Sequence, residues 1–152
     1  MKNYFKTLFL LISLFSNGCY SSPSSPSLSS KSISQTSYIE LTYKDVEDKT
    51  ILYSNIFGVE RDSYYVYFFS RTCSHCNELK PYILMIAVDR DDIYFVESSE
   101  QVIFLEDVEQ TVGLDNIEGF GILGYPTLIK IEEKKITKNI AGIPSIRNEL
   151  SN

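Results

Sequence analysis

Tryptophan is absent from the 152-residue sequence, and histidine occurs only once, as His75. Cysteine is also scarce, with three residues, Cys19, Cys73 and Cys76. A structural zinc site needs four ligands, whereas Cys73, Cys76 and His75 supply at most three and crowd into one helical turn. The sequence therefore predicts no metal centre, and nothing in it indicates another cofactor.

Basic residues are too few to balance the acidic ones. The 14 lysines and arginines stand against 20 aspartates and glutamates, a formal net charge of −6. Removal of an N-terminal leader containing Lys2 and Lys6 would take away two positive charges and leave −8. An excess of negative charge disfavours nucleic acid or an anionic membrane surface as a partner. We interpret the charge as a source of solubility.

The apolar run of residues 8–15 is shorter than the roughly 20 residues that a membrane-spanning helix needs. Two lysines precede it, a pattern typical of a secretory leader over residues 1–18. The next segment, Ser16-Asn-Gly-Cys19, resembles a bacterial lipobox, in which the cysteine is lipidated and becomes the mature N-terminus. Gly18 and Cys19 fit that pattern, whereas Ser16 and Asn17 depart from it. The alternatives are an ordinary cleaved signal peptide or an uncleaved anchor.

Lipidation of Cys19 would also account for the odd number of cysteines, because an unpaired thiol in an exported protein calls for an explanation. One pair, Cys73 and Cys76, would then remain. After Cys19, the chain up to residue 37 is rich in serine and proline, and Lys31 is its only charge. This composition predicts a disordered tether over residues 19–37. Residues 38–152 are left for one domain.

The remaining cysteine pair lies between an aromatic, strand-like run, residues 64–69, and a segment with helical periodicity. The apolar positions of that segment are Leu79, Ile83, Leu84, Met85 and Ala87. The pattern predicts a strand, a turn and a helix with both cysteines at the start of the helix. Unpaired backbone N–H groups and the helix dipole favour a thiolate there. We therefore expect Cys73 to be the exposed nucleophile and Cys76, one turn further in, to be the resolving thiol of a disulfide-exchange reaction.

The segment Cys73-Ser-His-Cys-Asn-Glu-Leu-Lys-Pro-Tyr82 resembles the active-site segment of thioredoxin-fold protein disulfide isomerases. Farther along, Gly124-Tyr-Pro-Thr-Leu128 resembles the loop that carries a cis-proline facing the cysteines in that superfamily. The resemblance spans roughly residues 38–150. It implies an α/β, thioredoxin-like fold, with a central mixed sheet flanked by helices, and thiol–disulfide oxidoreductase activity. It also implies that Pro126 is cis and exposes a strand edge at Tyr125, where the extended chain of a substrate can pair.

The residues around the pair modify this expectation. As an imidazolium, His75 would stabilise the Cys73 thiolate and make the disulfide more oxidising, although a merely solvated histidine is the alternative. The resembled family has tryptophan where this chain has Thr72, and many members bury an acid where it has Tyr67. Glu97 or a water molecule is a candidate replacement for that acid, and Tyr67 itself is interpreted as core packing. Pro81 is expected to kink the helix.

The other elements follow from periodicity and turn residues. We expect a strand at residues 38–42 and a helix at 45–57 with Val46, Ile51, Leu52, Ile56 and Phe57 inward. A buried parallel strand is expected at 93–96. We also expect a helix at 99–114 that packs on the core through Val102, Leu105, Val108 and Val112. The alternative is that this apolar stripe binds a partner protein. A hairpin over 127–132 and 135–140 and a two-turn final helix after Gly142 and Pro144 complete the expected fold.

The combined expectation is an extracytoplasmic thiol–disulfide oxidoreductase, anchored by lipid to a bacterial cell membrane and acting on the thiols and disulfides of exported proteins. His75 and the oxidising side of the membrane favour an oxidase or isomerase. One alternative is a reductase fed by a redox partner in the membrane. A thioredoxin-fold binding module without redox turnover is the other.

Overall fold

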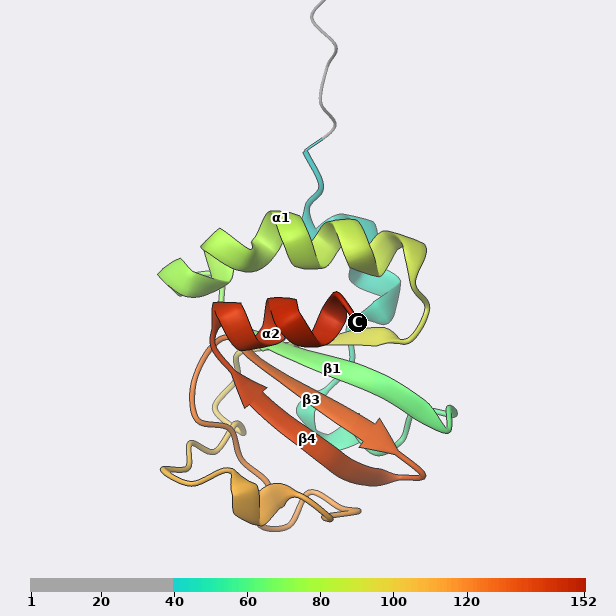
Figure 1. Cartoon of the computed structure of the whole chain (residues 1–152), viewed down its shortest axis with the longest axis vertical. Helices are drawn as coiled ribbons and strands as arrows, with labels where there is room; N and C mark the ends of the chain where they lie inside the picture. Colours follow the sequence, from blue (N-terminus) through green and yellow to red (C-terminus); the bar gives the residue numbers. More distant parts are fainter. Residues whose placement is uncertain (1–39) are drawn as a thin grey trace, which may run out of the picture. The chain divides into compact units, whose positions relative to one another are not determined.

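The computed structural model describes residues 40–152, so the expected leader, the lipid-attachment residue Cys19 and the tether all lie outside the described residues. A four-stranded sheet with the strand order β2–β1–β3–β4 forms the centre of the domain. Strands β1 (Ser63–Phe69) and β2 (Ile93–Glu97) are parallel, whereas β3 (Thr127–Glu132) runs antiparallel to β1 and to β4 (Lys135–Ala141). Helices flank this mixed sheet (Figure 1). The expected α/β, thioredoxin-like arrangement is thereby confirmed.

Strand β1 lies inside the sheet and is buried on both faces. All six residues from Tyr64 to Phe69 are buried, which explains why the sequence of this strand is a continuous apolar and aromatic run rather than an alternating one. Tyr65, Tyr67 and Phe69 face one side, and Tyr64, Val66 and Phe68 face the other.

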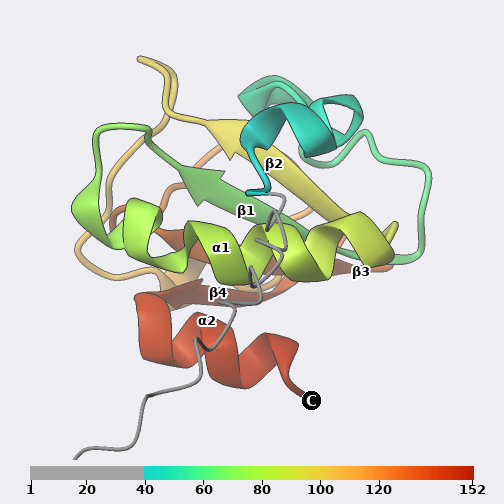
Figure 2. The same cartoon turned by 90° about the horizontal axis from the view of Figure 1, so that it is seen from above.

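Helices α1 (Ser74–Asp89) and α2 (Ile143–Leu150) cover the same face of the sheet (Figures 1 and 2). They pack on the side chains of Tyr65, Tyr67 and Phe69. Helix α1 continues through Pro81, and Met85, one of its apolar positions at helical spacing, is 55% exposed. The short final helix is confirmed. Within residues 40–152, no helix is both long and apolar enough to cross a bilayer.

The expected helix over residues 99–114 is wrong. The segment is irregular apart from one short 3-10 helix, η3 (Glu109–Thr111), and Phe104 pairs with Ile122 in an isolated parallel bridge. The N–H of Leu105 donates to the Ile122 carbonyl at 2.9 Å, and the N–H of Ile122 donates to the Ile103 carbonyl at 2.9 Å. The backbone groups of this segment form their hydrogen bonds with a segment distant in sequence, so helical hydrogen bonds are not required to pair them.

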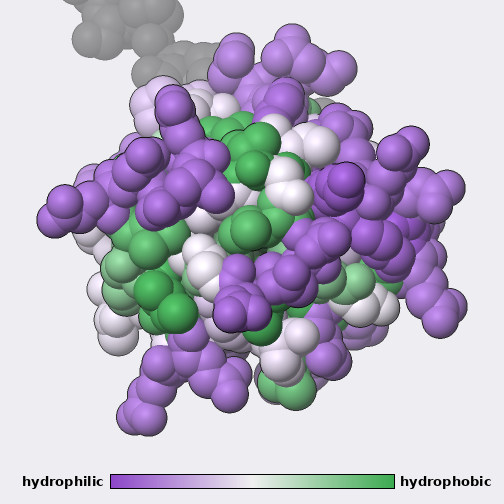
Figure 3. Space-filling model, turned by 90° about the horizontal axis from the view of Figure 1, so that it is seen from below, coloured by the Kyte–Doolittle hydropathy of each residue, from purple (hydrophilic) through white to green (hydrophobic). Residues whose placement is uncertain are grey.

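The irregular segment, here taken as residues 99–123, covers the second face of the sheet, where its residues Val102, Phe120 and Ile122 join the core. Several of its apolar side chains are nevertheless exposed: Ile103, Phe104, Val112 and, just beyond the bridge, Leu123. Figure 3 shows apolar residues gathered among hydrophilic ones on the side of the domain where this segment lies.

The N-terminal part of the domain also differs from expectation. Residues 40–42, the described part of the expected first strand, do not form a strand, and the expected helix over 45–57 is replaced by two 3-10 helices, η1 (Tyr43–Lys49) and η2 (Tyr53–Asn55). Between them, Thr50 bridges to Phe95 of β2 and the N–H of Ile51 donates to the Phe95 carbonyl at 2.8 Å. Pairing with the sheet edge extends the backbone there and interrupts the helix. Val46 and Ile56 are buried as expected, whereas Leu52 is exposed.

The expected hairpin between β3 and β4 is confirmed. Glu133 and Lys134 form its two-residue turn, and both have positive φ, 49° and 65°. A turn with two left-handed residues matches the twist of the strands it joins.

Gly121 packs closely within the irregular segment, and a substitution at this position tests that packing. A Cβ atom there would lie 2.7 Å from the Leu105 Cγ atom and 2.8 Å from the Ile103 carbonyl oxygen. We expect Gly121→Ala to lower the free energy of unfolding by about 1–3 kcal/mol, because overpacked sites must shift their neighbours. Gly124→Ala is the matched control, because a Cβ atom there meets nothing within 4 Å. Urea denaturation measures both variants, and equal stability of the two would contradict the observed packing.

Candidate redox site

Cys73 lies at the start of helix α1 as its N-cap residue, and the expected position of the pair at this helix start is confirmed. Its backbone is extended, with φ −80° and ψ 122°, and its N–H donates to the Ser70 carbonyl at 3.2 Å, which closes the turn after β1. The N–H of Cys76 donates to the Cys73 sulfur at 3.3 Å. An unpaired helix N–H therefore points at the sulfur, as a stabilised thiolate requires.

The two cysteines differ in burial. Cys73 is half-buried and reachable from solvent, whereas Cys76 is completely buried, and both are free thiols. A bulky disulfide of another protein can therefore reach the sulfur of Cys73 but not that of Cys76. This asymmetry fits an outer nucleophile and an inner resolving thiol.

Burial, the largest cause, and the interaction with Cys73 together raise the pKa of the Cys76 thiol to about 12. The backbone at Ser70 and the side chain of Tyr67 act in the opposite direction and lower this pKa. Cys76 is consequently a neutral thiol at ordinary pH. Cys76 must therefore lose its proton before or during its attack on the mixed disulfide.

The loop before β3 closes the site on the other side. The Tyr125–Pro126 peptide bond is cis, as expected from the resemblance, and the Cys73 thiol donates to the Tyr125 carbonyl at 3.4 Å. Thr127 fixes the loop, because its hydroxyl donates to the Gly124 carbonyl at 2.6 Å. The expected strand edge at Tyr125 is not formed, because Tyr125 lies in the bend before β3 and β3 itself is paired with β1 and β4 on its two sides. The loop nevertheless places the Tyr125 backbone beside the nucleophile, and the Tyr125 ring packs edge-on against Phe104 at 5.5 Å between centroids.

His75 is exposed on the first turn of α1. It borders a shallow hollow together with Glu78, Gly142, Ile143 and Pro144. Within the part of the chain that the structure describes, its side chain forms no ion pair. Its effect on the redox couple stays a prediction.

Tyr43 is a site residue that sequence reasoning missed. The Tyr43 ring stacks on Phe69 with centroids 4.0 Å apart, and the Arg71 guanidinium lies over the Tyr43 ring, 5.4 Å from its centroid. Arg71 in turn forms a two-contact ion pair with Glu97, with Nε to Oε1 at 2.7 Å. Glu97 is therefore engaged at the surface and does not replace a buried acid beside Cys76.

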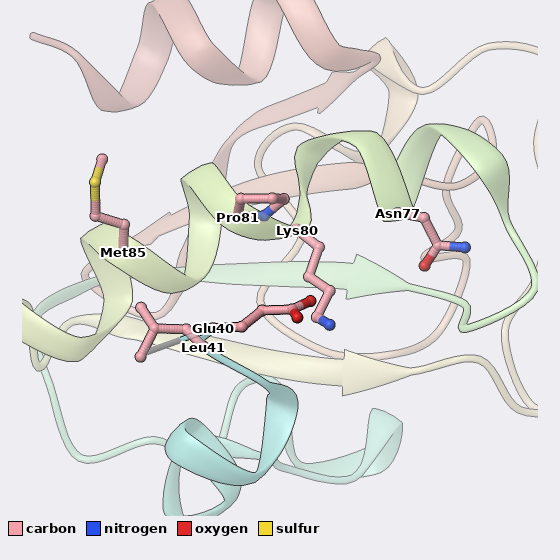
Figure 4. Close-up of a pocket in the computed structure, with 6 residues that line it drawn as sticks. All are labelled: Glu40, Leu41, Asn77, Lys80, Pro81 and Met85. Atoms are coloured by element: carbon pink, nitrogen blue, oxygen red, sulfur yellow. The ribbon is translucent and has the colours of Figure 1, made fainter. Parts of the chain in front are cut away.

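A hollow of about 540 Å³ runs along the flank of α1 and is lined by Glu40, Leu41, Asn77, Lys80, Pro81 and Met85 (Figure 4). Neither cysteine lines it, so it is not where the sulfur chemistry occurs. Among residues 40–152, no cluster of His, Cys, Asp and Glu has the geometry to hold a metal ion.

No protein-family model matches the chain, and no curated protein matches it. Solved structures of thioredoxins are similar to it. Mitochondrial thioredoxin 3 from Saccharomyces cerevisiae, in its oxidised form, is 14% identical, with a TM-score of 0.46 over 69% of this chain and 93% of that one. Thioredoxin from Plasmodium falciparum is 16% identical, with a TM-score of 0.46 over 68% and 96% of the two chains.

Proposed function

We propose that this chain is an exported thiol–disulfide oxidoreductase, tethered to the membrane by a lipid on Cys19 and acting on other exported proteins. One observation supports the exchange chemistry: a half-buried thiol, Cys73, caps a helix start, with a completely buried second thiol, Cys76, one turn further in. A pair that served only to stabilise the fold would not need one sulfur half-exposed beside the Tyr125 loop.

The reaction has two steps that run in either direction. A client thiolate attacks the Cys73 sulfur of the Cys73–Cys76 disulfide, and Cys76 leaves with the electron pair of the broken bond. A second client thiolate then attacks the client sulfur of this mixed disulfide, which closes the client disulfide and leaves Cys73 reduced. In the reverse direction Cys73 attacks a client disulfide and Cys76 resolves the mixed disulfide.

The surroundings of Cys73 support a protein client rather than a small molecule. The backbone at Tyr125, in the loop before β3, can pair with an extended chain, and the exposed apolar side chains of Ile103, Phe104 and Leu123 continue from Tyr125 along the irregular segment. Unfolded or partly folded proteins present both extended backbone and apolar side chains. Oxidase or isomerase activity is the favoured direction, because the extracytoplasmic side is oxidising and His75 follows Cys73 by two residues.

The exchange activity is tested with the oxidised protein and a reduced client that contains one native disulfide. We expect the client disulfide to form at a rate proportional to the amount of the protein. The matched control is the Cys73→Ser/Cys76→Ser double variant, which removes both thiols and keeps the loop at Tyr125. Full biological activity of the double variant would contradict the redox proposal and establish a binding module.

Membrane tethering is tested separately. Cys19→Ala should move the protein from the membrane fraction to the soluble fraction or block processing at that site, because no cysteine remains to carry the lipid. Disulfide exchange by the purified Cys19→Ala protein should not change, since residues 40–152 contain both redox cysteines. Cell fractionation measures the first effect. An Ala variant that stays as firmly membrane-bound as the wild type would contradict lipidation.

A further inference from the structure

Two tyrosine hydroxyls are buried in the cluster around Cys76 and have no hydrogen-bond partner of good geometry among the described residues. They belong to Tyr67, which is completely buried, and Tyr43. Other core tyrosines are satisfied: Tyr53, Tyr64 and Tyr65 donate to the Phe120 carbonyl, the Ile56 carbonyl and the Glu149 carboxylate at 3.1, 2.7 and 3.0 Å. An unpaired buried hydroxyl is destabilising, so its retention beside the redox pair requires an explanation.

The ring of Tyr67 is held in one position by aromatic neighbours. It lies parallel to the ring of Phe69, with an interplanar angle of 5° and centroids 6.0 Å apart, and Phe95 packs against it edge-on at 5.8 Å. Phe69 stacks with the rings of both Tyr67 and Tyr43. Packing of this kind fixes the ring and leaves the hydroxyl as the only polar group that Tyr67 brings to the site.

Tyr67 and Cys76 are packed in the same buried cluster, so the unpaired hydroxyl lies among the side chains around the Cys76 sulfur. It is one of the groups that lower the pKa of Cys76, against the larger effect of burial. The other titratable groups that act on Tyr67 are Tyr43 on η1 and Cys73 on α1, and neither is positively charged. Burial raises the pKa of Tyr67 itself, so the phenol keeps its proton. Tyr67 can therefore donate a hydrogen bond, but it does not serve as a base.

We propose that Tyr67 is a catalytic residue whose hydroxyl donates a hydrogen bond to the Cys76 sulfur whenever that sulfur carries negative charge. The proposal rests on the thiol–disulfide exchange proposed above. It differs from a buried acid in the same place, because a carboxylate takes up a proton, whereas the phenol stabilises the thiolate and keeps its own proton. The hydroxyl has no partner in the dithiol form because its partner, the Cys76 thiolate, exists only during the reaction.

The resolving step balances with no further reactant. The Cys76 sulfur attacks the Cys73 sulfur of the mixed disulfide, and the Cys73–Cys76 bond forms as the Cys73–client bond breaks. The client sulfur leaves with the electron pair of that bond, and the proton lost by Cys76 passes through solvent to the client thiolate. In the opposite direction Cys76 is the leaving group, and the same hydrogen bond stabilises it.

Tyr67→Phe tests the proposal, because it removes the hydroxyl and keeps the ring. Reduced protein is mixed with glutathione disulfide, quenched with acid and followed by mass spectrometry. The masses of the quenched species distinguish the glutathione–Cys73 mixed disulfide from the product of its resolution by Cys76, so the two steps are measured separately. We expect unchanged formation and resolution slowed about tenfold or more, the effect of losing a hydrogen bond to a charged group. The melting temperature should be no lower than that of the wild type, because the lost hydroxyl is unpaired in the dithiol form.

Tyr65→Phe is the matched control. It removes a hydroxyl from the same strand and the same face, but one that donates to Glu149 instead of meeting the cysteines. Resolution within about twofold of wild type in Tyr67→Phe, or an equal slowing of both steps, would overturn the role of Tyr67. A wild-type protein that forms no mixed disulfide at all would instead contradict the proposed function, so the two failures are distinguishable.

Discussion

Cys73→Ser should reduce disulfide exchange to the uncatalysed background, whereas Cys76→Ser should accumulate mixed disulfides with client proteins. The cause is the difference in burial within the pair: a client can reach the half-buried Cys73 sulfur but not the completely buried Cys76, which attacks Cys73 instead. Without Cys76, the first attack proceeds and the resolving attack does not. Non-reducing electrophoresis after alkylation of free thiols measures the trapped complexes.

Ser74→Ala is the matched control for these variants, because it changes an exposed residue between the two cysteines. It should exchange disulfides at a rate within about twofold of the wild type. Trapped complexes in Cys73→Ser rather than in Cys76→Ser would reverse the assignment of nucleophile and resolving thiol.

The resolving step should accelerate steeply with pH. Only the thiolate attacks, and burial raises the pKa of Cys76 to about 12, so the thiolate is the minor form throughout the ordinary range. Above the pKa the thiolate would dominate, and below it the thiolate fraction falls tenfold per unit. The rate of resolution should therefore rise about tenfold per pH unit between about pH 6 and pH 9. Burial, the largest cause, persists when Cys73 is joined to a client.

The same quenched reaction with glutathione disulfide measures this pH dependence in the wild type. Cys76→Ser is the control, because it undergoes only the first step and reports how attack by Cys73 depends on pH. A resolving rate that stays flat over this range would contradict a neutral Cys76 thiol in the resting protein.

The redox unit could be predicted from the sequence because its signals are local. A continuous aromatic run, two cysteines at a helix start and a helical stripe each depend on neighbours within a few residues, and strand β1 and helix α1 form as expected. The hairpin is equally local, since its turn residues follow directly on its strands.

The segments that differ from expectation are governed by distant contacts. Residues 99–114 have helical spacing, but the backbone of Leu105 pairs with Ile122, a partner that periodicity cannot indicate. Thr50 similarly pairs with Phe95 across the sheet edge and interrupts the expected helix. At the site, Tyr43 was missed because only the fold brings it onto Phe69. Tyr67 was recognised as lying where the resembled family has an acid, but its unpaired hydroxyl becomes visible only once the packing is known.

The reduction potential of the Cys73–Cys76 pair tests the central claim most directly. Equilibration against glutathione buffers should give a reversible two-electron couple with a potential less negative than about −270 mV, the value typical of thioredoxin. His75→Ala should shift it downward by about 10–30 mV, because a nearby cation stabilises the reduced form. Lys80→Ala, which removes a cation farther along the same helix, should leave it unchanged. A wild-type potential at or below about −270 mV, unmoved by the His75 change, would contradict the oxidising role and favour a reductase. Failure of the pair to form a reversible disulfide would contradict the exchange chemistry itself.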